Sequence, residues 1–169
     1  VRIARLKNKM GTKSLPTAEL ELDGMRGWLI GEEGKGFKYI LTGLNAERTL
    51  IAAECIGDGY WFTDKVVAYA KERVVFGRPI GQNQGIQHPL AKCWAQLEAA
   101  NLMVMKAAQL FDQRQECGVE ANAGKYLAGE FGFEACHTAM LSMGGMGLAQ
   151  EYHVERYVRE AAILRTVPV

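Results

Sequence analysis

Residues 36–73 read GFKYILTGLNAERTLIAAECIGDGYWFTDKVVAYAKER, and this stretch decides the fold. Its large apolar side chains recur every three or four residues, at Phe37, Ile40, Leu41, Leu44, Ile51, Cys55, Phe62, Val66 and Tyr69. That spacing is typical of an amphipathic α-helix with one face against a core. At 1.5 Å per residue the helix would be roughly 50 Å long. Gly43, Gly57 and Gly59 each weaken it by about 1 kcal/mol relative to alanine, so we expect them at close contacts between helices.

Three further segments show the same periodicity. The first begins near Gln84 and is expected to end at Gly118. The second runs from about Glu120 to Met143 and stops at a glycine-rich turn, and a shorter helix runs from about Val154 to Leu164. Three long helices and one short helix with short connections predict a mainly α fold, an antiparallel up-and-down four-helix bundle.

A short β lead-in precedes the bundle. Apolar and polar residues alternate over 17–23, which is typical of a half-buried strand, and residues 2–10 form a weaker strand candidate before a turn at 11–14. Two strands alone are marginally stable in water. We therefore expect an incomplete β region over residues 1–30 and a helical domain over residues 31–169. The first residue, Val1, lies inside a strand-like pattern, which predicts that the sequence is a piece of a longer protein.

The composition excludes several classes of protein. The 169 residues suit one domain, and the net charge of +1 with no basic block argues against nucleic acid as a partner. The four cysteines form no CxxC pair, and we expect them to be reduced and buried in a reducing compartment. The three histidines show no ligand spacing with the cysteines, so no metal site is expected. Neither a membrane-spanning run nor a signal peptide is recognisable.

Three segments, in collinear order, resemble the acyl-CoA dehydrogenase family. Gly31–Phe37 (GEEGKGF) matches the family's GxEGxGF entry to a long helix. Glu72–Ile80 (ERVVFGRPI) followed by Gln84 resembles its ERxxFGxxI…Q segment. Residues 144–161 contain GGMG, EYHVER and REA, similar to its GGxG…EYPVER…RDA segment. The resemblance implies that residues 1–30 are the tail of the family's central β-domain and that residues 31–169 are its C-terminal helical-bundle domain.

The resemblance also implies an activity. The family oxidises the Cα–Cβ bond of an acyl-CoA thioester: a carboxylate takes the α-proton, and the N5 atom of FAD accepts the β-hydride. The implied partners are an acyl-CoA substrate, electron-transfer flavoprotein as acceptor, and further copies in a homodimer or homotetramer. The implied location is a bacterial cytoplasm or the mitochondrial matrix. For the piece by itself we expect no activity and weak or no FAD binding, and the sequence does not show which acyl chain is used.

The catalytic base is where this sequence departs from most of the family. In most members it is the glutamate of a YEGT-type loop, which would align with Pro168, and proline has no proton-accepting side chain. Isovaleryl- and long-chain-type members carry the base on the first long helix, at the position of Glu47. Burial under a thioester and a flavin would raise the pKa of such a carboxylate towards a useful value. The alternative for Glu47 is a solvated helical glutamate.

The resemblance assigns the cofactor contacts to a partner subunit's FAD. Arg73 would contact the pyrophosphate, Phe76 the adenine and Gln84 the nucleotide. Gly144 and Gly145 would let backbone N–H groups approach the nucleotide. The alternatives are a helix-terminal charge for Arg73, loop packing for Phe76, and a helix C-cap and turn for the two glycines.

Three further positions complete the set of candidates. Arg48 would reach towards the acyl-CoA, with an exposed surface arginine as the alternative. Leu141 stands where the family usually has a glutamine, which puts part of the adenosine contact in doubt, and His153 replaces the proline of EYPVER. Other functions stay open: a non-catalytic assembly domain of the family, or a relative acting as an acyl-CoA oxidase or flavin monooxygenase.

Overall fold

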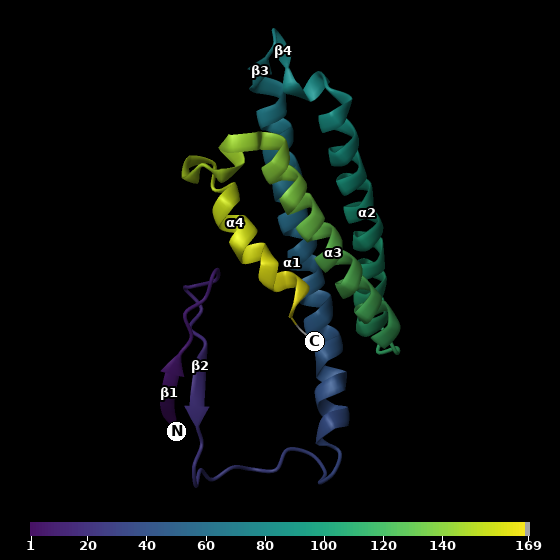
Figure 1. Ribbon diagram of the computed structural model, residues 1–169. Coiled ribbons are helices and arrows are strands. Elements are labelled where there is room, and N and C mark those ends of the chain that lie inside the picture. Colours follow the sequence, from purple (N-terminus) through teal and green to yellow (C-terminus); the bar gives the residue numbers. More distant parts are fainter. Residues whose placement is uncertain (168–169) are drawn as a thin grey trace.

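The computed structural model describes residues 1–167 and confirms the mainly α bundle with a short β lead-in (Figure 1). The helices are α1 (Gly36–Glu72), α2 (Gln84–Asp112), α3 (Gly118–Met143) and α4 (Val154–Ala161). Short 3₁₀ turns are η1 (Ile80–Gln82), η2 (Gly144–Leu148), η3 (Gln150–Tyr152) and η4 (Ala162–Arg165). The strands are β1 (Arg2–Leu6), β2 (Ala18–Glu21), β3 (Val74–Val75) and β4 (Arg78–Pro79).

The core lies where α3 packs against both α1 and α2, and α4 covers the α1–α3 side. Its fully buried side chains include Phe62 and Val66 from α1 and Leu97 from α2. Of Gly43, Gly57 and Gly59, only Gly59 meets a neighbouring helix among residues 1–167, because a Cβ there would lie 2.5 Å from Leu97. In the described part of the chain nothing lies within 4 Å of a Cβ at Gly43 or Gly57, so the expected close contacts are wrong for those two.

The boundary between the second and third helices differs from the expected one. α2 ends at Asp112, and Gly118 is the first residue of α3 rather than the end of the preceding helix. The Arg114 N–H bonds to the Phe111 carbonyl and the Gln115 N–H to the Leu110 carbonyl, with Arg114 at φ 57°. These bonds form a Schellman-type helix end. Glycine is the usual residue at the left-handed position of this motif, so an arginine there gave no signal in the sequence.

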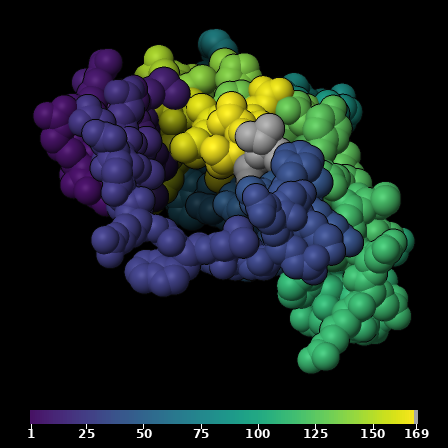
Figure 2. Space-filling model, turned by 90° about the horizontal axis from the view of Figure 1, so that it is seen from below, coloured from purple at the N-terminus to yellow at the C-terminus, as the bar shows by residue number. Residues whose placement is uncertain are grey.

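The N-terminal hairpin stands beside the bundle and touches it at its tip. β1 and β2 pair antiparallel, and a Cβ on Gly11 in the connecting turn would lie 2.5 Å from the Arg159 carbonyl oxygen of α4. Figure 2 shows the hairpin (purple) against α4 (yellow). Within residues 1–167, β2 is exposed over almost its whole length and no other element covers either face, so the expected half-burial of this strand stays a prediction. Within residues 1–167, no helix is both long and apolar enough to cross a membrane.

Candidate functional site

Along α1, the predicted site residues Glu47 and Arg48 lie far from Arg73. Glu47 and Arg48 lie in the N-terminal third of α1, whereas Arg73 is its C-cap residue. At 1.5 Å per residue, Glu47 and Arg73 are roughly 40 Å apart along the helix axis. Gln84 opens α2 next to the end of α1, and Gly144 and Gly145 form the turn after α3.

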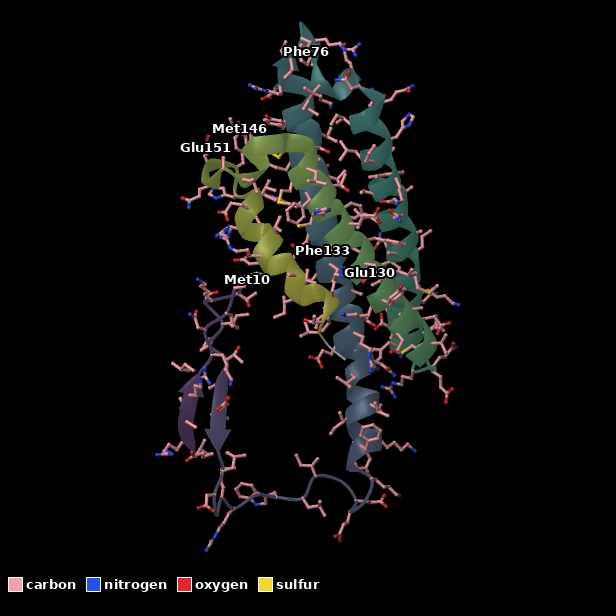
Figure 3. The ribbon with its side chains drawn as sticks, in the orientation of Figure 1. Met10, Phe76, Glu130, Phe133, Met146 and Glu151 are labelled. Carbon is pink, nitrogen blue, oxygen red and sulfur yellow. The ribbon has the colours of Figure 1, made fainter. Side chains whose placement is uncertain are left out.

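The β3–β4 hairpin holds Phe76 out into solvent. Val75 pairs with Arg78, and the two residues between them, Phe76 and Gly77, both have positive φ (54° and 80°). This is a type I′ turn, which matches the twist of the flanking strands. A bulky residue at positive φ costs on the order of 1 kcal/mol. The Phe76 side chain is nevertheless fully exposed, with a relative exposure of 102%, so no packing against the rest of residues 1–167 offsets that cost (Figure 3).

Arg73 and Gln84 frame this hairpin. The Arg73 N–H donates to the Tyr69 carbonyl, and the Arg73 carbonyl accepts from the Ile80 N–H at 2.9 Å, which closes the base of the hairpin. Both the Arg73 and Gln84 side chains are exposed. The structure therefore brings Arg73, Phe76 and Gln84 together at one end of the bundle, all facing solvent.

The glycine turn after α3 has two parts with different surroundings. Gly144 has φ 59° and ψ −136°, a conformation open in practice to glycine alone. Gly144 and Gly145 are exposed, and no atom of residues 1–167 that could obstruct a side chain lies within 4 Å of an added Cβ on either. Gly147 is instead pressed against the Met140 carbonyl and is needed for packing. Leu141, at 64% exposure, presents an apolar side chain beside this turn.

The loop before α4 has a left-handed backbone conformation at His153. Its φ of 62° lies in the left-handed region, and it is the N-cap residue of α4. Proline is restricted to φ near −65° and cannot adopt this geometry. The backbone at His153 is therefore incompatible with the proline that stands in the EYPVER motif.

Glu47 and Arg48 are neighbours on α1 but differ in burial. Glu47 is exposed on α1, while Arg48 is half-buried and donates from Nη1 to Asn45 Oδ1 at 3.4 Å. Arg48 lines a cavity of about 190 Å³ together with α3 and the end of η4. The exposed-surface alternative for Arg48 is therefore wrong. Pro168, which aligns with the usual catalytic glutamate, lies outside the described residues.

Two ionisable side chains that the sequence did not single out are buried or half-buried. Asp58 on α1 has its pKa raised to about 6, first by burial and then by the nearby carboxylates of Glu54 and Glu160. Lys125 on α3 is 9% exposed and lines the same cavity as Arg48. A signal for Lys125 was present, because it is a lone charge in the small-residue run AGKYLAG. Nothing local marks Asp58.

The cysteines are buried thiols. All four are free, as expected. Burial raises the pKa of Cys55 to about 11 and that of Cys136 to about 12, and it also raises the pKa of Cys93. Such thiols are poor nucleophiles at neutral pH. In the part of the chain that the structure describes, no three His, Cys, Asp or Glu side chains gather in a way that could hold a metal ion.

Comparison with known protein families shows to which family this helical bundle belongs. The model of the acyl-CoA dehydrogenase C-terminal domain matches residues 34–167. The chain belongs to the acyl-CoA dehydrogenase family. The match covers most of the chain and confirms the resemblance carried by the three motifs. Members of this family are flavin-dependent oxidoreductases.

Individual members of the acyl-CoA dehydrogenase family agree with this assignment. FadE12 of Mycobacterium tuberculosis is 40% identical over 143 residues, 83% of this chain and 37% of its own length. The mitochondrial short/branched chain specific acyl-CoA dehydrogenase of Rattus norvegicus is 35% identical over 165 residues, 96% of this chain and 38% of its own length. The structure of butyryl-CoA dehydrogenase from Megasphaera elsdenii superposes with a TM-score of 0.88 at 31% identity, covering 98% of this chain and 44% of that one. The chain thus spans under two fifths of the length of these two curated relatives.

Proposed function

We propose that this chain is the C-terminal part of an FAD-dependent acyl-CoA dehydrogenase, with residues 1–30 from the central β-domain and residues 31–169 as the helical domain. The observation that carries the proposal, beyond family membership, is the Phe76–Gly77 turn. Phe76 has a strained backbone and a fully exposed aromatic ring, although packing within the described part of the chain requires neither. Such strain is typical of a site that contacts a ligand.

The residues at this end fit an FAD nucleotide. Arg73 would bind the pyrophosphate through its fork of N–H donors, Phe76 would stack on the adenine, and Gln84 would hydrogen-bond to the nucleotide. The open backbone at Gly144 and Gly145 would admit a nucleotide within reach of their N–H groups. FAD, when bound, supplies the acceptor for the β-hydride.

Glu47 is the proposed base. In the whole protein, the domains absent here would cover Glu47, and its carboxylate would remove the α-proton of the acyl-CoA while Arg48 contacts the substrate. The separation of roughly 40 Å between Glu47 and Arg73 supports a shared site, in which Arg73 and Phe76 serve the FAD of a partner subunit. The active form would then be a homodimer or homotetramer. Electron-transfer flavoprotein is the proposed acceptor, and the proposed location is a bacterial cytoplasm or the mitochondrial matrix.

The test is Glu47→Gln in the full-length enzyme. The amide keeps the shape of the side chain but cannot accept the proton, so we expect kcat to fall by about 10³-fold or more. The flavin absorbance of the purified enzyme should stay unchanged. Glu54→Gln, two turns further along α1, is the matched control and should keep full activity. Normal turnover in Glu47→Gln would sink the assignment of the base.

A further inference from the structure

Lys125 is a buried lysine whose side chain has one hydrogen-bond partner among residues 1–167. It is 9% exposed on α3, and its Nζ donates to the Leu164 carbonyl oxygen at 2.8 Å. Among residues 1–167, no carboxylate forms an ion pair with it. A buried charge without an ionic partner is costly, so the Leu164 carbonyl and the helix end that carries it must compensate.

The Leu164 carbonyl lies at the C-terminal end of the α4–η4 segment, where helix carbonyls lack intrahelical donors and favour a cation. Two helices, α1 and α3, converge on it. The Cys55 thiol of α1 lies 4.0 Å from the same oxygen. A Cβ on Gly129 of α3 would lie 3.2 Å from it, so only a small residue there allows the approach.

Arg165, the next residue, is held by the same face of α3. Its Nε donates to Glu130 Oε1 at 2.8 Å and its Nη2 to Glu130 Oε2 at 2.7 Å. Its guanidinium also lies 5.0 Å from the centre of the Phe133 ring. Figure 3 shows Glu130 and Phe133 on α3 beside the end of α4. Two consecutive residues are thus fixed to α3, one by a buried bond and one by a bidentate surface pair.

This fixed segment faces the turn of α1 that carries the proposed base. Lys125, Glu130 and Arg165 line the 190 Å³ cavity that Arg48 of α1 also lines. Arg48 directly follows Glu47. A shift of the Leu164–Arg165 segment would therefore change the packing of Arg48 and the orientation of the α1 turn at Glu47.

We propose that Lys125 is a positioning residue for the dehydrogenation: by holding the Leu164 carbonyl, it keeps the end of α4 against the Glu47–Arg48 turn of α1. This inference rests on the proposed function. In this proposal the Lys125 side chain contacts neither the substrate nor FAD. Its effect passes through the backbone of residues 164 and 165 and through the cavity they share with Arg48.

The test uses Lys125→Met in the full-length, FAD-loaded enzyme. The amides of Thr166 and Val167 both donate to the Ile163 carbonyl. Without the Lys125 bond this turn opens more often, and we expect their hydrogen–deuterium exchange to become about 10-fold faster. We expect kcat to fall about 10-fold through misalignment, with a larger α-deuterium isotope effect and little change in KM. Lys125→Arg, which keeps a donor, should restore most of kcat.

Tyr60→Phe is the control for a purely structural effect, because it removes the Tyr60–Glu98 hydrogen bond between α1 and α2 away from this cavity. It should leave the isotope effect unchanged. Unchanged kcat and isotope effect in Lys125→Met, or equal losses in Lys125→Met and Lys125→Arg, would overturn the proposal. If Lys125→Met does not fold, Glu130→Gln releases Arg165 alone and should show the same changes at smaller size; no change there would overturn it too. The isotope effect reports α-proton removal by whichever group performs it, so a failure of Glu47 as base remains distinguishable.

Discussion

At Phe76 the backbone adopts a conformation that a phenylalanine enters only at a cost, and the ring gains no contact in return. Phe76→Asn gives the turn the Asn-Gly pair that type I′ hairpins prefer. We expect the free energy of unfolding to rise by about 0.5–1 kcal/mol as the strain is relieved. In the full-length enzyme we expect FAD affinity to fall about 10-fold, because the proposed aromatic partner of the adenine is lost. Urea denaturation and flavin absorbance after dialysis measure the two effects.

Arg114 provides a control for this prediction. It also has a positive φ, of 57°, but lies at the opposite end of α2 from the hairpin. Arg114→Asn should stabilise the chain by relieving the same kind of strain, while FAD retention stays at the original level. If Phe76→Asn retains FAD as well as Arg114→Asn does, the ring is not a nucleotide contact.

At the scale of the elements, the α1–α3 contact depends on a glycine that carries no special signal in the sequence. A Cβ on Gly132 of α3 would lie 2.5 Å from the Cys55 carbonyl oxygen of α1. Gly132→Ala must therefore push the two helices apart, and we expect it to destabilise the bundle by about 2 kcal/mol. Thermal unfolding followed by circular dichroism measures the change.

Gly57 lies on the exposed face of α1, and an alanine there should have the opposite effect on stability from Gly132→Ala. Among the residues that the structure describes, nothing lies within 4 Å of a Cβ there, so Gly57→Ala should stabilise α1 by about 0.5–1 kcal/mol through helix propensity alone. Equal effects of Gly57→Ala and Gly132→Ala would contradict the packing described for α3.

The sequence predicted the helices well where the signal is local. The periodicity of 36–73 marks α1 almost to the residue, because a helix against a core repeats its apolar face over many turns. The end of α2 and the β3–β4 hairpin were missed, because Arg114 and Phe76 occupy left-handed positions that usually take glycine or asparagine. The hydrogen bond from Lys125 to the Leu164 carbonyl was also missed, because the two residues lie 39 positions apart in the sequence. Glu47, Arg73, Phe76 and the Gly144–Gly145 turn came from family resemblance rather than periodicity, and their roles stay predictions.

For the whole molecule, Asp58 makes stability depend on pH. Its pKa of about 6 in the folded chain exceeds the ordinary value of 3.8, because burial and the carboxylates of Glu54 and Glu160 oppose its charge. The folded state then binds more protons than the unfolded state between these values. The contribution of this group to the free energy of unfolding should therefore be complete below about pH 3.8 and be lost as the pH rises through 6.

Asp58→Asn removes the charge that the fold opposes. We expect it to raise the free energy of unfolding at pH 7.5 by on the order of 1 kcal/mol, a value reduced for the partial exposure of the carboxyl, and to have little effect at pH 4. Asp64→Asn, at an exposed position of the same helix, is the control. Urea denaturation at several pH values gives the comparison, and identical slopes for the original chain and Asp58→Asn would refute the assignment.

The burial of Cys55, Cys93, Cys117 and Cys136 has a practical consequence for labelling. Alkylating and maleimide reagents attack thiolates that they can reach, and these four side chains are at most 3% exposed. A cysteine introduced on the surface, for example at Gly57 or in the β1–β2 turn, would then be the most reactive thiol of this chain while it stays folded. Dyes for distance measurements between the hairpin and the bundle could be attached without first replacing the native cysteines.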